Sequence, residues 1–355
     1  LFAVLISLLA AGAANAGERC TYKILSSSGA PELKRGINLT RCWEDGQEKA
    51  LTREEIRNLG RMGFDFVRLP FSIKWLTLED ADDRAEKLAQ MRCDIVKLLA
   101  QNLTIVLDFH APGTYQDKLR REPKKAARHL EEVWLSLTPV LDDLPPDRIL
   151  LGLYNEPQFD NDTWWPIQEE LVRNLRPAFP LHTFVVMSGP HGEPWNLAQK
   201  KPYDDKNIIY DFHFYEPLFL THHGAPWFPE GDRNRKTVPI EYPVKPGDKA
   251  EDPDVKKYNQ DDWSRRKLTV YIDGIAGWRK LWGGRIACLE FGVFRPYVNP
   301  GSRANWLRDM RELMEEANIP WALWEYRGGF GLLGDNGVPE PGIVKALGLK
   351  DYTVP

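Results

Sequence analysis

Short apolar runs alternate with amphipathic stretches along the chain from residue 36 onward. Eight runs have the length and the β-branched or aromatic content of a buried strand, and they cover 36–39, 64–69, 103–108, 149–153, 183–187, 207–211, 285–289 and 320–324. Between them, apolar residues recur at helical spacing over 53–62, 82–101, 124–141, 163–175, 263–281 and 302–318. The first of these helices opens on a capping box formed by Thr52 and Glu55.

Strict alternation of eight strands with helices predicts a parallel sheet, and eight strands favour closure into a single (β/α)8 TIM barrel. An open doubly wound sheet is the alternative, but no Gly-x-Gly-x-x-Gly turn supports it. Residues 216–262, after the sixth strand, form an unusually long connection that is rich in Pro and charge and has no periodic segment. We expect it to pass over the active face and shape one rim of a cleft; a solvated loop without a role is the alternative.

Residues 1–16 form an apolar stretch that is too short to span a bilayer and ends in the A-x-A sequence Ala14-Asn15-Ala16. This pattern predicts a signal peptide over 1–16, whose basic segment is missing, followed by one catalytic domain over 17–355. A buried or membrane-anchoring helix is the alternative. We therefore expect a secreted or periplasmic protein that no longer contacts a membrane after cleavage.

Export permits disulfides, but the four cysteines allow three connectivities, and the sequence does not choose among them. Cys288 lies inside an apolar run and is expected to be a buried small hydrophobe. The other three are Cys20, Cys42 and Cys93.

Two motifs place a glutamate where a buried strand ends. Glu156 follows the run 149–153 in Tyr-Asn-Glu-Pro, and Glu290 follows the run 285–289 in Leu-Glu-Phe-Gly. In both, a Pro or Gly then interrupts the strand. A carboxylate at such a position costs free energy unless it is used or paired. Two carboxylates on separate strands are what acid/base chemistry on a glycosidic bond requires.

Other chemically useful side chains share this placement at or just beyond the C-terminal ends of strands, where a barrel brings them to one face. Six strands carry one each: Arg68, His110, Glu156, His213, Glu290 and Trp324. The net charge of −4 gives no basic surface for nucleic acid. Thirteen tryptophans suit sugar faces as well as cores.

At these residues the sequence resembles glycoside hydrolase family five, the cellulase-like retaining β-glycanases of clan A, from residue 36 to about residue 334. The family-wide positions occur in order: Arg68 in Val-Arg-Leu-Pro, His110 in Leu-Asp-Phe-His, Asn155-Glu156-Pro157, His213 and Tyr215 in Asp-Phe-His-Phe-Tyr, Glu290 in Leu-Glu-Phe-Gly, and Trp324 in Ala-Leu-Trp-Glu.

The resemblance implies that Glu156 is the general acid/base and that Glu290 is the nucleophile, with the two carboxyls about 5–5.5 Å apart. Arg68 and Tyr215 are expected to keep Glu290 ionised. Burial, together with loss of the charge on Glu290, is expected to raise the pKa of Glu156.

Supporting roles are implied in the same way. Asn155 is expected to bond the sugar 2-hydroxyl, Trp324 to lie under the sugar at the cleavage point, and the two histidines His110 and His213 to bond sugar hydroxyls or the acid/base. Glu325 could reach the rim or pair internally. Three histidines outside the motifs are expected to be structural or on the surface, namely His129, His182 and His191. Some of five other tryptophans should stack on sugars in distal subsites: Trp43, Trp75, Trp164, Trp165 and Trp195.

The implied activity is that of a monomeric, cofactor-free endo-β-1,4-glucanase acting on a β-linked polysaccharide or oligosaccharide. β-Mannanase and exo-β-1,3-glucanase of the same family are alternatives, because the catalytic core does not distinguish them. A metal-dependent barrel hydrolase is a chemical rival, because Asp108-x-His110 and Asp211-x-His213 repeat a spacing that can hold a cation. The glycosidase pattern explains both repeats, and we predict no metal. A non-catalytic sugar-binding protein would lack a glutamate that is present here.

Overall fold

The computed structural model describes residues 33–40, 42–43, 50–76, 80–227, 239–245 and 251–350, except for the side chain of Trp75. Its eight strands form a closed barrel in chain order, and β8 pairs in parallel with β1. The strands are β1 (Arg35–Asn38), β2 (Phe66–Phe71), β3 (Thr104–Phe109), β4 (Ile149–Gly152), β5 (Phe184–Met187), β6 (Ile208–Phe214), β7 (Arg285–Phe291) and β8 (Trp321–Leu323). The predicted (β/α)8 barrel is confirmed, and the open sheet is wrong.

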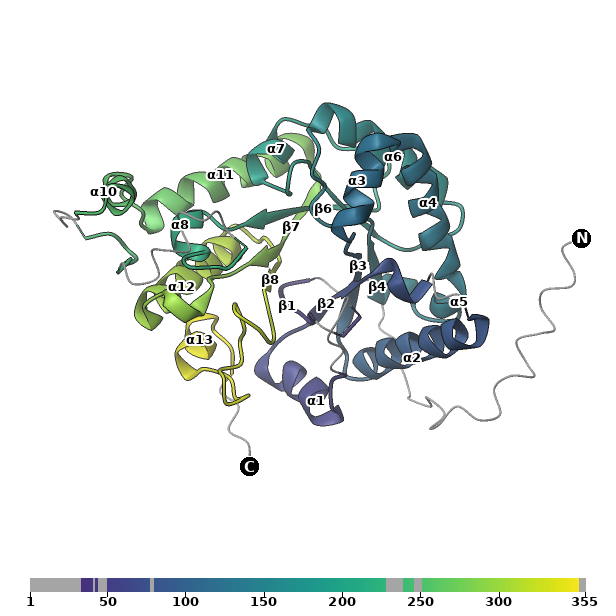
Figure 1. The fold of residues 1–355 in the computed structure, drawn as a ribbon, viewed down its shortest axis with the longest axis horizontal. Coiled ribbons are helices and arrows are strands. Elements are labelled where there is room, and N and C mark those ends of the chain that lie inside the picture. Colours follow the sequence, from purple (N-terminus) through teal and green to yellow (C-terminus); the bar gives the residue numbers. More distant parts are fainter. Residues whose placement is uncertain are drawn as a thin grey trace, which may run out of the picture.

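Helices surround the barrel on its outside (Figure 1). They are α1 (Arg53–Met62), α2 (Ala81–Leu99), α3 (Gly113–Arg121), α4 (Pro123–Ser136), α5 (Thr138–Leu141), α6 (Asn161–Leu175), α7 (Pro194–Ala198), α8 (Leu218–Thr221), α10 (Pro253–Gln260), α11 (Arg265–Trp282), α12 (Pro300–Glu316) and α13 (Pro341–Ala346), with 3-10 turns η1 (Ile73–Leu76), η2 (Pro146–Arg148) and η3 (Arg295–Tyr297). The capping box of Thr52 and Glu55 is present at α1. The single helix predicted over 124–141 is wrong, because it is broken at Leu137.

The fold has one apolar layer inside the barrel and a second one outside it. A polar layer lies inside the barrel, on the C-terminal side of the inner apolar layer. The inner apolar layer fills the lower half of the barrel with Leu33, Phe66, Val106, Leu150, Val185, Ile209, Ala287, Leu289 and Ala322. The larger apolar layer lies between the strands and the surrounding helices. Because side chains alternate along a strand, the inward residue two positions after Phe66 is Arg68, and the one after Val106 is Asp108. This alternation places a polar layer near the C-terminal mouth of the barrel.

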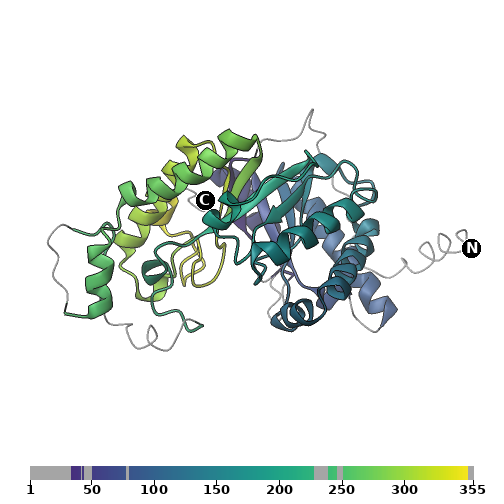
Figure 2. The same cartoon turned by 90° about the horizontal axis from the view of Figure 1, so that it is seen from above.

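The connection after β6 differs from the prediction of an aperiodic excursion. It contains α8 and also α10, which begins at an Asp252 N-cap followed by Pro253. In its later part, the Tyr242 hydroxyl donates a hydrogen bond to Asp309 of α12 at 2.9 Å. Figure 2 shows α10 at one end of the molecule, beside α11 and α12. In the first part of the connection, His222 packs edge-on against Tyr215, which follows β6 directly.

The predicted signal peptide over 1–16 lies outside the described residues, as does Cys20. Cys93 is disulfide-bonded. Cys288 is wholly buried with a free thiol, which confirms its predicted place in the core. Within the described ranges, no helix is both long enough and apolar enough to cross a membrane.

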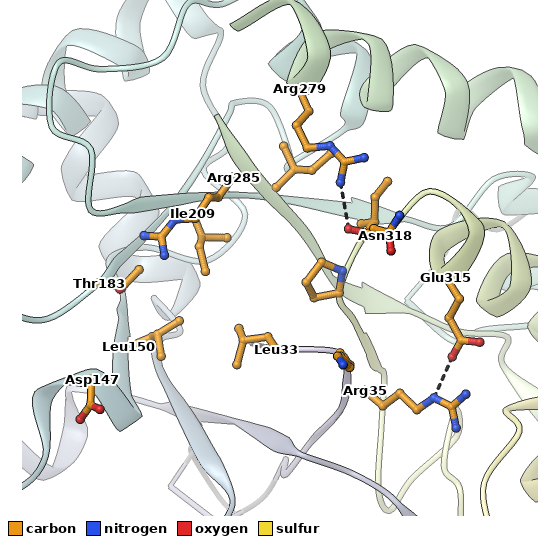
Figure 3. A pocket seen from close by; sticks show the side chains of 14 residues that line it. Leu33, Arg35, Asp147, Leu150, Thr183, Ile209, Arg279, Arg285, Glu315 and Asn318 are labelled. Atoms are coloured by element: carbon orange, nitrogen blue, oxygen red, sulfur yellow. Dashed lines mark hydrogen bonds and ion pairs between the residues drawn. The ribbon is translucent and has the colours of Figure 1, made fainter. Parts of the chain in front are cut away.

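A pocket of about 640 Å³ opens at the N-terminal ends of the strands. Leu33, Leu150 and Ile209 line its floor, and Arg35 and Arg285 lie at its rim (Figure 3). Arg35 is held there by an ion pair with Glu315, at 2.8 Å. This pocket lies at the opposite end of the barrel from the polar layer and takes no part in the candidate site.

Candidate active site

Arg68 on β2 is the centre of the polar layer and is wholly buried. Its guanidinium donates to Asp108 at 2.8 Å, to Asn155 at 2.6 Å and to Asn38 at 3.0 Å, and it forms an ion pair with Glu290. Burial alone would lower the pKa of Arg68, but Asp108 and Glu290 outweigh it and raise the pKa. A buried charge of this kind is tolerated only with such partners. Arg68 therefore fixes the positions of residues from four different strands or their ends.

Glu290 is the one acidic residue of β7 and is buried. Glu290 has a second partner in addition to Arg68: the Tyr215 hydroxyl donates a hydrogen bond to Glu290 Oε2 at 3.0 Å. Gly292 follows at the end of the strand, and a Cβ there would collide with the backbone oxygen of Trp324. The Glu-x-Gly spacing therefore lets the ends of β7 and β8 approach closely beside the carboxylate.

Glu156 lies just beyond β4 and has a φ of 43°, a left-handed conformation that is uncommon for a residue other than glycine. Such strain persists where the surrounding structure enforces it, and it is frequent at functional sites. The side chain is 35% exposed, so it faces the mouth of the barrel. His213 on β6 places its Nδ1 2.7 Å from Glu156 Oε1.

The two glutamates face each other across the mouth. One carboxylate oxygen from each, and one ring nitrogen of His213, all lie within 4.8 Å of one another. His213 Nδ1 is also 3.4 Å from Glu290 Oε2. The separation of about 5–5.5 Å between carboxyl groups that retaining glycosidases need is compatible with this arrangement.

The pKa values of the two carboxyls are shifted in the order opposite to the one expected. Burial raises the pKa of Glu290 in spite of the opposing effects of His213 and Arg68. Burial acts on Glu156 in the same direction, but the hydrogen bond and charge of His213 outweigh it and lower its pKa. A bond from His213 to the acid/base was among the expectations, but its lowering effect on the pKa of Glu156 was not included. The expectation also assigned the wrong sign to the loss of charge on Glu290, which lowers the pKa of a neighbouring acid.

His110 and Trp324 form a parallel pair beside the glutamates, with ring centroids 5.9 Å apart and planes inclined by 5°. The His110 Nε2 lies 3.0 Å from Asp108 Oδ2, so Asp108 connects this histidine to Arg68. Gly152 lies next to Asp108, and a Cβ at this position would collide with the Asp108 carboxylate. The glycine of Leu-Gly-Leu is thus required by the polar layer.

The first part of the connection after β6 adds aromatic side chains to this face. The His222 ring centroid is 5.0 Å from that of Tyr215, and Trp227 packs edge-on against Phe294 at 5.2 Å. Burial lowers the pKa of His222 to about 4, although the charge of Glu156 opposes the shift. The sequence showed these aromatic residues in the connection, but it gave no signal that they would flank Tyr215.

Several individual expectations are settled by the packing. Glu325 pairs internally, because the Thr40 hydroxyl donates to it at 2.5 Å. His129 stacks on Tyr115, and His182 is buried, which lowers its pKa to about 4. His191 is exposed and lies near enough to Glu156 for its charge to affect that carboxyl.

Of the five tryptophans considered for distal subsites, four have side chains that the structure describes, and the side chain of Trp75 lies outside the described residues. Trp43, Trp164 and Trp165 are buried in the core, so these three are packing residues. Their apolar strand-end positions are equally typical of packing residues, and the sequence does not distinguish the two. Trp195 on α7 is 37% exposed. Asn38, which the sequence argument missed, is a buried partner of Arg68 whose signal was a lone amide at the end of an apolar strand.

The residues of the metal-dependent alternative do not gather around one point. Among the described residues, Glu156, His213 and Glu290 are the only group of His, Cys, Asp or Glu atoms close enough to share a cation. Neither Asp108 nor Asp211 belongs to it, and Asp108 is neutralised by Arg68 instead. In the two Asp-x-His repeats, Asp108 lies 3.0 Å from His110, and Asp211 lies 3.5 Å from His213.

A closed (β/α)8 barrel with two facing carboxylates at its mouth defines the class of barrel glycosyl hydrolases. The family model described as cellulase (glycosyl hydrolase family 5) matches residues 25–329. The chain therefore belongs to glycosyl hydrolase family 5, as the resemblance predicted.

Known relatives agree with this membership. The chain is 26% identical to Endoglucanase 3 of Fibrobacter succinogenes, an alignment that covers 89% of this chain and 53% of that protein, so the chain spans about half of that relative's length. It is 27% identical to Endoglucanase C of Acetivibrio thermocellus, over 78% of this chain and 84% of the relative. Thermotoga maritima Cel5A, solved in complex with mannotriose, shares the fold with a TM-score of 0.72 at 23% identity, covering 89% of this chain and 97% of that one.

Proposed function

We propose that the chain is a retaining endo-β-1,4-glucanase that hydrolyses β-glucan by double displacement, with Glu156 as acid/base and Glu290 as nucleophile. The observation that carries the proposal is the pair of carboxylates from β4 and β7, whose nearest oxygens lie within 4.8 Å across the barrel mouth. Two carboxyls at this separation fit direct attack on a sugar carbon between them better than activation of an intervening water.

In the first step, a Glu290 oxygen attacks the anomeric carbon while Glu156 gives its proton to the glycosidic oxygen, which leaves with the bonding electron pair. Tyr215 and Arg68 aim the nucleophile through their contacts with Glu290. The product of this step is an ester between the sugar and Glu290. Its formation removes the negative charge of Glu290, which lowers the pKa of Glu156 and converts it into a base.

In the second step, Glu156 takes a proton from water, and the water oxygen displaces Glu290 from the anomeric carbon. The two inversions restore the original anomeric configuration. Asn155, which Arg68 holds at 2.6 Å, is placed to bond the sugar 2-hydroxyl, a contact that strengthens as positive charge develops on the ring. Trp324 and His110 form the adjacent wall and are assigned to sugar stacking and hydroxyl binding.

The assignment to β-1,4-glucan is supported by the endoglucanase names of the relatives, whereas the mannotriose complex of Cel5A keeps mannan as the second candidate. We expect cellohexaose to be cut internally into oligosaccharides and mannohexaose to be cut more slowly. The product profile of the two hexaoses measures this preference. Cleavage of mannohexaose without cleavage of cellohexaose would replace glucan by mannan, and release of glucose alone would indicate exo action. Activity should survive EDTA, since no step uses a metal.

We also propose that residues 17–355 form one catalytic domain that is exported after removal of residues 1–16 and acts as a monomer without a cofactor. The A-x-A sequence at residues 14–16 supports the cleavage point. The disulfide at Cys93 is a bond typical of proteins that leave the cytosol.

A further inference from the structure

Asp211 lies on the inner face of β6, two residues before His213, and its side chain is buried. One carboxylate oxygen, Oδ1, accepts a hydrogen bond from the backbone N–H of Leu289 at 2.9 Å. The other, Oδ2, lies 3.5 Å from the His213 Nε2. Neither Asp211 Oδ2 nor His213 Nε2 has a hydrogen bond to another described residue. Two buried polar atoms that face each other in this way are stabilised only if one of them carries a proton for the other.

The other ring nitrogen of His213 also faces carboxylates. Its Nδ1 is 2.7 Å from Glu156 Oε1 and 3.4 Å from Glu290 Oε2. A neutral imidazole has one donor and one acceptor nitrogen, whereas ionised carboxylates only accept. A ring with acids on both sides is satisfied when both nitrogens donate, which is the imidazolium form.

We propose that Asp211 is a positioning residue that orients His213 and holds it as an imidazolium cation between the two glutamates. The inference rests on the proposed function, because the proton that the leaving group receives is then shared between His213 and Glu156. When two groups interact this strongly, each apparent pKa belongs to the pair rather than to either residue alone.

The charges around His213 support this state. Carboxylates face the region from β3, β6, β7 and the end of β4, namely Asp108, Asp211, Glu290 and Glu156, while Arg68 on β2 is the fixed cation. Other titratable groups in the described part of this region are His110, His191, His222, Tyr215 and Cys288. Burial raises the pKa of the Tyr215 hydroxyl and of the Cys288 thiol, so both stay neutral. Burial disfavours a charge on His213, but Glu290, Asp211 and Glu156 outweigh it and raise its pKa to about 10.

The substitution Asp211→Asn removes the charge and keeps an oxygen acceptor for Leu289. We expect the alkaline limb of the pH profile of kcat/KM on cellohexaose to move to lower pH by about one unit or more, because the shared proton loses a buried counter-charge. On the alkaline limb, the ratio of wild-type to Asp211→Asn kcat/KM should therefore be about tenfold larger than at the wild-type optimum. An alkaline limb that stays in place in a folded Asp211→Asn protein would overturn the proposal.

Cys288→Ala is the matched control, since Cys288 is buried near Asp211 but carries no charge. It is expected to lower the melting temperature and leave the limbs of the pH profile in place. A similar shift in both variants would mean that Asp211 acts through packing alone.

A measurement on the wild-type protein keeps the proposal testable if Asp211→Asn fails to fold. With ¹⁵N-labelled histidine, the His213 ring should show two protonated nitrogens at about pH 8, far above the ordinary histidine pKa of about 6.5. A His213 ring that is neutral at that pH contradicts the inference. The protonation state of His213 can be measured without turnover. If the wild-type protein hydrolysed none of the β-glycans, the proposed function would be refuted, but the inference on His213 would not.

Discussion

Glu290→Gln is expected to lower kcat/KM on cellohexaose by about 10⁴-fold or more, because an amide cannot form the sugar ester. The amide keeps the shape of the carboxyl and its acceptor oxygen for the Tyr215 hydroxyl, so oligosaccharide binding should be largely retained. Steady-state kinetics and calorimetric titration with cellohexaose measure the two effects separately. Wild-type turnover in this variant would remove the assignment of Glu290 as nucleophile.

Glu315→Gln provides a matched control for that experiment. Glu315 is a partly buried glutamate on α12 that pairs with Arg35 at the opposite end of the barrel. Its replacement should leave kcat/KM within about twofold of wild type, since exposed or half-exposed ion pairs contribute little. A large loss of activity in both variants would indicate general damage to the barrel rather than loss of a nucleophile.

Glu156→Ala is expected to reduce kcat/KM on cellohexaose by about 10²–10⁴-fold, the range typical of general acid–base catalysis. The loss should be much smaller for a dinitrophenyl β-cellobioside, because this leaving group departs without a proton and kcat/KM reports the first step. Azide should accelerate the variant, since it attacks the glycosyl-enzyme without the help of a base, and the product should be a β-glycosyl azide. Equal losses on both substrates, with no effect of azide, would refute the acid/base role.

The barrel was predictable because each strand is a largely apolar run, and the closed sheet brings the chemically useful residues at or beyond the ends of several strands to one face. The alternation from Phe66 to Arg68 and from Val106 to Asp108 then carries the transition from apolar to polar layers. The helix capped by Thr52 was readable for a similarly local reason. Local patterns thus determined the architecture and the placement of the candidate residues.

Properties that depend on distances between strands were not readable. The order of acidity of Glu156 and Glu290 depends on His213, which lies 2.7 Å from one and 3.4 Å from the other. Trp164 and Trp195 follow strands in similar ways, yet the first is buried in the core and the second is 37% exposed. The proposed role of Asp211 depends on the pairing of β6 with β7, which brings the Leu289 N–H to its carboxylate, and on the alternation along β6, which brings His213 to the same face.

The most direct test of the account is to trap the covalent intermediate with a 2-deoxy-2-fluoro cellobioside that bears a good leaving group. Fluorine slows both steps, and the activated leaving group lets the ester accumulate. Mass spectrometry of the digested protein should place one cellobiosyl unit on the peptide that contains Glu290. A label on a different carboxylate, or no label together with products of inverted anomeric configuration, would contradict the account.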